Sequence, residues 1–143
     1  MTAATSSAPA TRELKTTTFA TLGVVLAAVV IFAGNYNVPK GENGGTGPAV
    51  FTAILCAVIA AGLFAVVLPR VRSHNRAVLV LGILTVLSIV VFWSGVTPIL
   101  AVATFAVADR EPSPTGLASI VRWLAAAAAV LAVVWTLANS HLF

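Results

Sequence analysis

Few side chains in this sequence could carry out chemistry, and their positions argue against it. The two histidines are His74, in a short basic segment, and His141, near the end of the chain. A membrane-bound haem needs an axial histidine on a helix at the depth of the haem, and neither histidine lies within a long apolar stretch. We therefore expect no haem and no other cofactor.

The acidic residues and the cysteine also fail to form a site. Asp109 and Glu111 flank Arg110 and precede two prolines, a pattern more typical of a solvated turn than of paired catalytic carboxylates. The single cysteine, Cys56, cannot form an intramolecular disulfide or a metal cluster, and it is interpreted as a small buried apolar residue. With no nucleophile, zinc or phosphate-binding motif, the sequence predicts no catalytic residue and no metal site.

Ionisable residues are almost excluded from the apolar stretches. Arg122 lies about one and a half turns inside the last stretch, and a side chain there can extend back to the lipid headgroups. A proton relay or ion pathway normally places acidic or basic groups within the membrane, so ion-coupled transport has little support. We expect Arg122 and the link residues Arg70, Arg72 and Arg76 to contact anionic headgroups.

The elements that carry these residues are apolar and long. Only 8% of residues are charged and 59% are hydrophobic, whereas a soluble domain carries about 25% charged residues. A helix needs about 20 apolar residues to span a bilayer. The sequence therefore predicts an all-α, polytopic transmembrane bundle. The high pI of about 10.3 does not indicate nucleic-acid binding, because the basic residues are few and lie at the ends of the apolar stretches. These stretches are 17–33, 48–68, 77–108 and 117–138.

The third stretch decides between four and five spans. As one helix, residues 77–108 would be about 48 Å long, well above the roughly 30 Å of a hydrocarbon core. A break at Ser94-Gly95, with Pro98 in the first turn of a return helix, would give two spans, 77–93 and 96–108. The second of these would be short, and the four-span alternative remains open.

The positive charges favour five spans with a cytoplasmic N-terminus. In that topology Lys40 is the only basic residue outside, whereas four spans would also place Arg110 and Arg122 outside. Five spans also put Trp93 at an interface, where tryptophan is enriched. We predict a multi-pass protein of the bacterial plasma membrane. Residues 1–16 are expected to be a disordered cytoplasmic segment and residues 139–143 a short tail.

Small residues recur at intervals that would let helices pack closely. In lipid, helix association depends on close backbone approach rather than on the hydrophobic effect. The expected packing residues are Gly23, Ala27, Ala57, Ala61, Ala65, Ala125, Ala128, Ala129 and Ala132.

The central part of the chain resembles a family pattern. Val80-Leu81-Gly82-Ile83-Leu84, followed by Phe92-Trp93-Ser94-Gly95-Val96-Thr97-Pro98, is similar to a segment of small actinobacterial multi-span membrane proteins. In that pattern a span with Leu-Gly, a Trp-x-Gly turn with a nearby proline, and an Ala-rich return form a hairpin. The resemblance covers about a third of the chain, supports the hairpin and implies an actinobacterial source, and it carries no functional residue across.

Together these features favour a non-enzymatic role. We predict an accessory or scaffold subunit of a larger bacterial membrane complex, associated with the lipid bilayer and with other membrane subunits or further copies of itself. The alternative is a small transporter or channel component that acts as an oligomer, and a membrane enzyme comes third. We do not expect the protein to bind nucleic acid.

Overall fold

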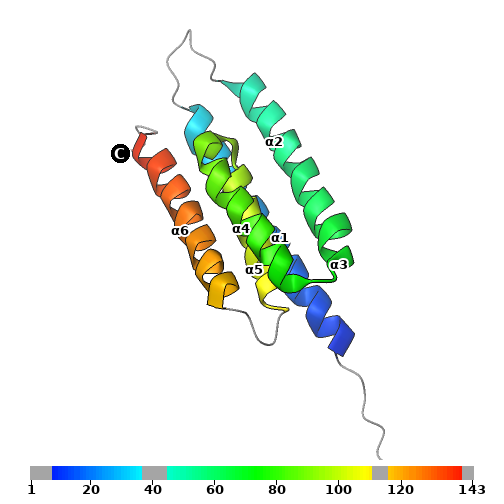
Figure 1. Ribbon diagram of the computed structural model, residues 1–143. Helices are drawn as coiled ribbons and strands as arrows, with labels where there is room; N and C mark the ends of the chain where they lie inside the picture. The colour runs from blue at the N-terminus through cyan, green and yellow to red at the C-terminus, as the bar shows by residue number, and fades with distance from the viewer. Residues whose placement is uncertain (1–7, 37–44, 111–115, 140–143) are drawn as a thin grey trace, which may run out of the picture.

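The computed structural model describes residues 8–36, 45–110 and 116–139, and these residues form helices and short links without strands. The predicted all-α bundle is therefore confirmed. Figure 1 shows α2 and α6 on opposite sides of the bundle, with α1, α4 and α5 between them. The helical elements are α1 (Ala8–Tyr36), α2 (Thr46–Ala61), the π-helical η1 (Gly62–Val67), α3 (Leu68–Arg70), α4 (His74–Leu87), the 3₁₀-helical η2 (Ser88–Ser94), α5 (Val96–Ala108) and α6 (Gly116–Asn139).

Among the described residues, four helical segments are long and apolar enough to cross a membrane. Two of them are composite, because α2, η1 and α3 run on as one rod, and α4 continues into η2. The fifth helix, α5, has 13 residues and is shorter than the length that spans a bilayer alone. The four long segments are Lys15–Asn35, Thr46–Arg70, His74–Val91 and Gly116–Asn139.

The break between η2 and α5 is the one expected from the sequence. Gly95 has φ 73° and ψ 1°, a left-handed conformation that disfavours side chains with a Cβ. Val91, with φ −113° and ψ 39°, also departs from helical geometry just before the turn. Pro98 lies in the first turn of α5, where its missing N–H removes no helical hydrogen bond. The predicted hairpin at Ser94-Gly95 is confirmed.

The short helix α5 is the centre of the bundle. It packs against α1, α4 and α6, and nearly all its residues from Thr97 to Ala108 are buried, Phe105 being half-buried. At 1.5 Å per residue it is about 20 Å long. Because its neighbours cover it on all sides, its length need not match the thickness of the hydrocarbon, which is the constraint on a lipid-facing helix.

Small residues permit the close approach of these helices. A Cβ at Gly82 of α4 would overlap the Val121 Cγ1 atom of α6, so the two helices cross closely at that point. On α1, Gly23 also faces α5, but a Cβ there would meet the Val102 Cβ at an ordinary contact distance of 3.5 Å, so this position has room for alanine. The rod α2–η1–α3, by contrast, packs mainly against α1 and lies at the edge of the bundle.

The first helix begins earlier than the expected first span at residue 17. Residues 1–16 were expected to be disordered, but α1 begins at Ala8, and residues 8–16 continue the helix toward the link regions. The Ala/Thr-rich composition of this segment is typical of disorder, but Lys15 and Thr16 within it bind the end of α5, as described below. Residues 1–7 and 140–143 lie outside the described part of the chain.

Candidate functional site

The up-and-down course of the chain brings the described basic residues toward one end of the bundle. This basic end consists of the start of α1, the end of α3, the start of α4 and the end of α5. Lys15 Nζ lies 3.1 Å from Asp109 Oδ2, and both side chains are substantially exposed. An exposed ion pair of this kind contributes only about 0–1 kcal/mol to stability. Its role is to align α1 with the end of α5.

Arg110 connects three elements at the basic end. Its Nη1 donates to the Leu68 main-chain oxygen at 3.0 Å, and its Nη2 donates to Thr16 Oγ1 at 3.0 Å. The last carbonyls of a helix lack partners within the helix and carry a partial negative charge. Arg110 adds a second donor to the Leu68 carbonyl, which also accepts from the Val71 N–H at 3.4 Å, and Arg70 Nη1 donates to the Val66 carbonyl one turn earlier at 2.8 Å. These two arginines therefore hold the end of the α2–η1–α3 rod.

Arg122 has different surroundings from the other arginines. Its guanidinium carbon lies 5.9 Å from the centre of the Phe105 ring and 5.4 Å from that of Trp123, both cation–π distances. Its Nε is buried without a hydrogen-bond partner among the described residues. The arginine as a whole is half-buried. The predicted headgroup residues Arg72 and Arg76 are exposed in or beside the link between α3 and α4.

The buried serine and threonine hydroxyl groups form hydrogen bonds within the protein. Thr97 Oγ1 donates to the Ser88 carbonyl at 3.0 Å, and Ser88 Oγ lies 2.9 Å from Thr97 Oγ1, so the pair ties η2 to α5. Ser88 Oγ also lies 2.8 Å from the Thr85 carbonyl. Three further buried threonines each donate to the carbonyl four residues earlier. They are Thr85, Thr104 and Thr136.

Sequence reasoning missed the pairing of Ser88 with Thr97. The available signal was the presence of hydroxyl residues on both sides of the predicted hairpin, since a buried hydroxyl must find a partner. Cys56 is buried as expected, and it also makes a contact that was not expected. Its Sγ lies 2.7 Å from the Ser94 carbonyl, so the thiol caps the end of η2.

The predicted packing residues fall into an internal and an external set. Gly23 and Ala27 are buried on α1, and the four alanines of α6 are buried, with Ala125 and Ala129 packed on Ala101 of α5. Ala57, Ala61 and Ala65 are exposed on the outer side of the α2–η1 segment. Their role in helix packing stays a prediction. The four alanines of α6 are Ala125, Ala128, Ala129 and Ala132.

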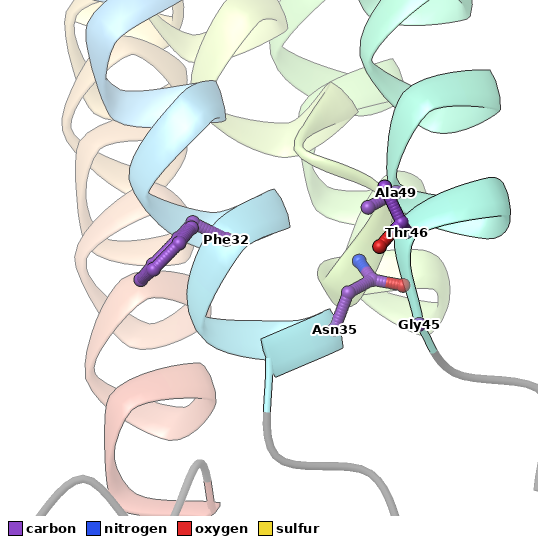
Figure 2. Close-up of a pocket in the computed structure, with 5 residues that line it drawn as sticks. All are labelled: Phe32, Asn35, Gly45, Thr46 and Ala49. Atoms are coloured by element: carbon purple, nitrogen blue, oxygen red, sulfur yellow. The ribbon is translucent and has the colours of Figure 1, made fainter.

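A cavity of about 410 Å³ lies at the opposite end of the bundle, between the end of α1 and the start of α2. Figure 2 shows the Asn35 amide and the Thr46 hydroxyl directed toward each other across this space, while Phe32 points away. Asn35 Nδ2 donates to the Ile31 carbonyl at 2.7 Å, so that part of the amide is already engaged. Residues 37–44, which include the Lys40 that the five-span topology places outside, lie outside the described part of the chain.

The described residues contain no group of three or more histidine, cysteine or acidic side chains that could hold a metal ion. His74 lies at the basic end, whereas His141 and Glu111 lie outside the described residues. Comparisons with protein-family models, curated proteins and solved structures find no match to this chain.

Proposed function

We propose that this chain is a non-enzymatic accessory or scaffold subunit of a larger bacterial membrane complex, and that it docks through the outer side of α2. The observation that carries the proposal is the exposure of Ala57 and Ala61 on α2 and of Ala65 on the η1 segment that continues it, at the edge of the bundle. The other predicted small-residue faces, on α1 and α6, are already covered inside the chain. The stripe on α2 is left for contact with another helix.

The chemistry of lipid explains why such a stripe matters. Apolar side chains gain little by leaving lipid for a protein surface, so helices associate where small residues let their backbones approach. On α2 the small residues recur every four positions, which places them along one side of the helix. Phe51, Ile54 and Val58 lie beside them and are 71%, 60% and 64% exposed. They would form the edges of a groove-like contact.

The buried polar groups support a structural rather than a catalytic interior. Each buried serine or threonine of the described residues binds a main-chain carbonyl, and Ser88 and Thr97 also bind each other. A site for substrate or ion normally keeps polar groups available within the membrane. The interior hydroxyls here are engaged by main-chain carbonyls, and the Ser88–Thr97 pair also joins η2 to α5.

One observation favours the alternative of a small transporter or channel component. The backbone is irregular at two places within apolar segments, at Val91 in η2 and in the π-helical η1, and interrupted helices often line binding sites in transporters. In this chain, however, the hydroxyls near η2 bind each other, and Cys56 covers the Ser94 carbonyl. These contacts satisfy the polar groups at the irregular backbone of η2, which favours the accessory role.

The proposal is tested by comparing two matched substitutions on α2. Ala61→Leu adds bulk to the stripe, whereas Leu55→Phe adds bulk at an exposed position about 120° around the helix. Each tagged variant is purified from native membranes in several mild detergents, and the co-purifying chains are identified by mass spectrometry. We expect a stoichiometric partner with the parent and with Leu55→Phe, and its loss with Ala61→Leu at unchanged helix content.

Three outcomes would overturn the proposal. These are a lone monomer in every detergent, retention of the partner by Ala61→Leu, and equal loss from both variants. Recovery of copies of this chain alone, dissociated by Ala61→Leu, would shift the conclusion to the oligomeric transporter or channel component.

A further inference from the structure

We infer that Arg122 binds the phosphate of an anionic lipid headgroup, with Phe105 and Trp123 holding its guanidinium group in position. The inference is independent of the proposed docking through α2, because it concerns the opposite side of the bundle. It assigns a specific ligand class to one arginine rather than a general attraction to all of them.

The geometry holds the guanidinium while leaving part of it open. The rings of Phe105 and Trp123 meet edge to face, with centres 6.0 Å apart and an interplanar angle of 81°. Both rings lie within cation–π distance of the guanidinium carbon of Arg122. The Nε is buried and faces no acceptor among the described residues, whereas the side chain as a whole is only half-buried. A phosphate would approach the terminal nitrogens, since the Nε is buried.

The charge of Arg122 is not balanced within the described part of the chain. Asp109 is the only acidic residue whose side chain the structure describes, and it pairs with Lys15. Arg70 and Arg110 bind helix-end carbonyls, so they have partners of their own. A half-buried cation in an apolar segment is costly without an anion nearby. No acidic side chain among the described residues is left to balance Arg122, and an anion from outside the chain would supply that balance.

Arg122 lies near the first end of α6, where a helix that spans a bilayer would meet the headgroups. It lies six residues after Gly116, the first residue of α6, which is about 9 Å along the helix. Helical side chains lean toward the N-terminus, so the guanidinium is displaced toward the basic end. Trp123 is 62% exposed beside it, and tryptophan is enriched at the level of the headgroups.

The neighbourhood indicates a lipid rather than a soluble phosphate. The outward residues of α6 around Arg122 are apolar and largely exposed, with Leu117 at 59%, Ile120 at 59% and Leu124 at 53%. In a bilayer this surface lies against acyl chains, so an anion that reaches Arg122 carries such chains with it.

The test measures lipid binding by the whole chain. The parent, Arg122→Gln and Arg72→Gln are purified in a neutral detergent at about 0.15 M salt, where charges more than about 8 Å apart are largely screened. Phosphatidylglycerol, phosphatidylcholine and inorganic phosphate are titrated separately, and bound lipids are counted by native mass spectrometry. We expect Arg122→Gln to weaken phosphatidylglycerol binding about tenfold, because a charge-assisted hydrogen bond is lost. Arg72→Gln, which removes an exposed charge, should weaken it by about twofold at most.

A second readout reports contact at the site itself. With Trp93→Phe and Trp135→Phe in the background, Trp123 is the only tryptophan, and lipids with brominated chains quench its fluorescence on contact. Brominated phosphatidylglycerol should quench Trp123 more than brominated phosphatidylcholine at equal mole fraction in nanodiscs, and Arg122→Gln should abolish the difference.

Equal effects of the two arginine substitutions would overturn the inference in favour of diffuse attraction. Equal quenching by the two lipids would also overturn it. Saturable binding of inorganic phosphate that Arg122→Gln removes, without preference for phosphatidylglycerol, would show a soluble anion site and reject the lipid.

Discussion

The turn at Gly95 should control the stability of the whole bundle, and Gly95→Ala tests this directly. Gly95 has φ 73°, where a residue with a Cβ costs about 1–2 kcal/mol. The added Cβ would also lie 3.0 Å from the Ala27 carbonyl oxygen and 3.2 Å from both Ala27 Cβ and Ile31 Cγ1. Crowding of this kind in a packed core costs about 1–3 kcal/mol. The greater chain entropy of glycine in the unfolded state offsets about 0.4–1 kcal/mol.

The expected loss is therefore about 1–5 kcal/mol, which by the scale of soluble domains lowers the midpoint of thermal unfolding by roughly 10 °C. The free energy of unfolding is measured by sodium dodecyl sulfate titration in mixed micelles, with helix content followed by circular dichroism. The control is Gly23→Ala on α1, where a Cβ meets Val102 Cβ at an ordinary contact distance of 3.5 Å. Its effect should lie between no change and about 1 kcal/mol of stabilisation, because alanine favours helix.

A double variant separates the two contributions. Adding Ala27→Gly to Gly95→Ala removes the contact with Ala27 Cβ but leaves the left-handed backbone and the Ala27 oxygen in place. We expect the double variant to be more stable than the two single losses added together, a positive coupling between neighbours. The reasoning is refuted if Gly95→Ala unfolds at the same detergent concentration as Gly23→Ala, because the turn would then be neither strained nor crowded.

Three further predictions concern the rest of the bundle. Arg110→Gln should lower the free energy of unfolding by about 1–3 kcal/mol, because its hydrogen bonds to Leu68 and Thr16 are lost. Lys15→Gln, which removes an exposed ion pair, should lower it by less than about 1 kcal/mol. Similar losses for the two variants in the same titration would contradict the assigned roles. Ala129→Leu should overpack the contact with α5 and lower the free energy of unfolding by about 1–3 kcal/mol. Val130→Leu, at a position that is 63% exposed, should leave the free energy of unfolding unchanged. If neither variant changes it, the alanines of α6 do not pack as assigned. Reporter fusions at Gly116 and after Phe143 should report a cytoplasmic and an external location, respectively, and a cytoplasmic C-terminus would support four spans.

The helices and the hairpin could be predicted because their signals are local. An apolar run with charged residues only at its ends specifies a helix of membrane length, and Ser94, Gly95 and Pro98 together specify where the chain turns. The start of α1 could not be predicted in the same way. Its composition is typical of disorder, and Lys15 and Thr16 have partners that come from the distant end of α5.

The central position of α5 also could not be predicted, because it depends on tertiary packing. Its 13 residues suggested an awkward, short span, whereas the structure surrounds it with longer helices. The same holds for the two arginines near α5. Arg110 and Arg122 look alike in sequence, yet one binds a main-chain carbonyl and a hydroxyl, while the other lies against two aromatic rings without a hydrogen bond to the described residues.

The two sets of alanines show most clearly how structure changes the functional argument. From the sequence, the alanines of α6 and those of 57–65 were equally expected to pack against other helices, but Ala125 and Ala129 contact α5 within the chain. By contrast, Ala57 and Ala61 of α2 and Ala65 of η1 are exposed on the outer side of the bundle, where a partner helix could reach them. Since lipid provides no hydrophobic drive for association, close backbone approach at such a stripe is the main route to a stable contact. The outer side of α2 is therefore where a partner should be sought.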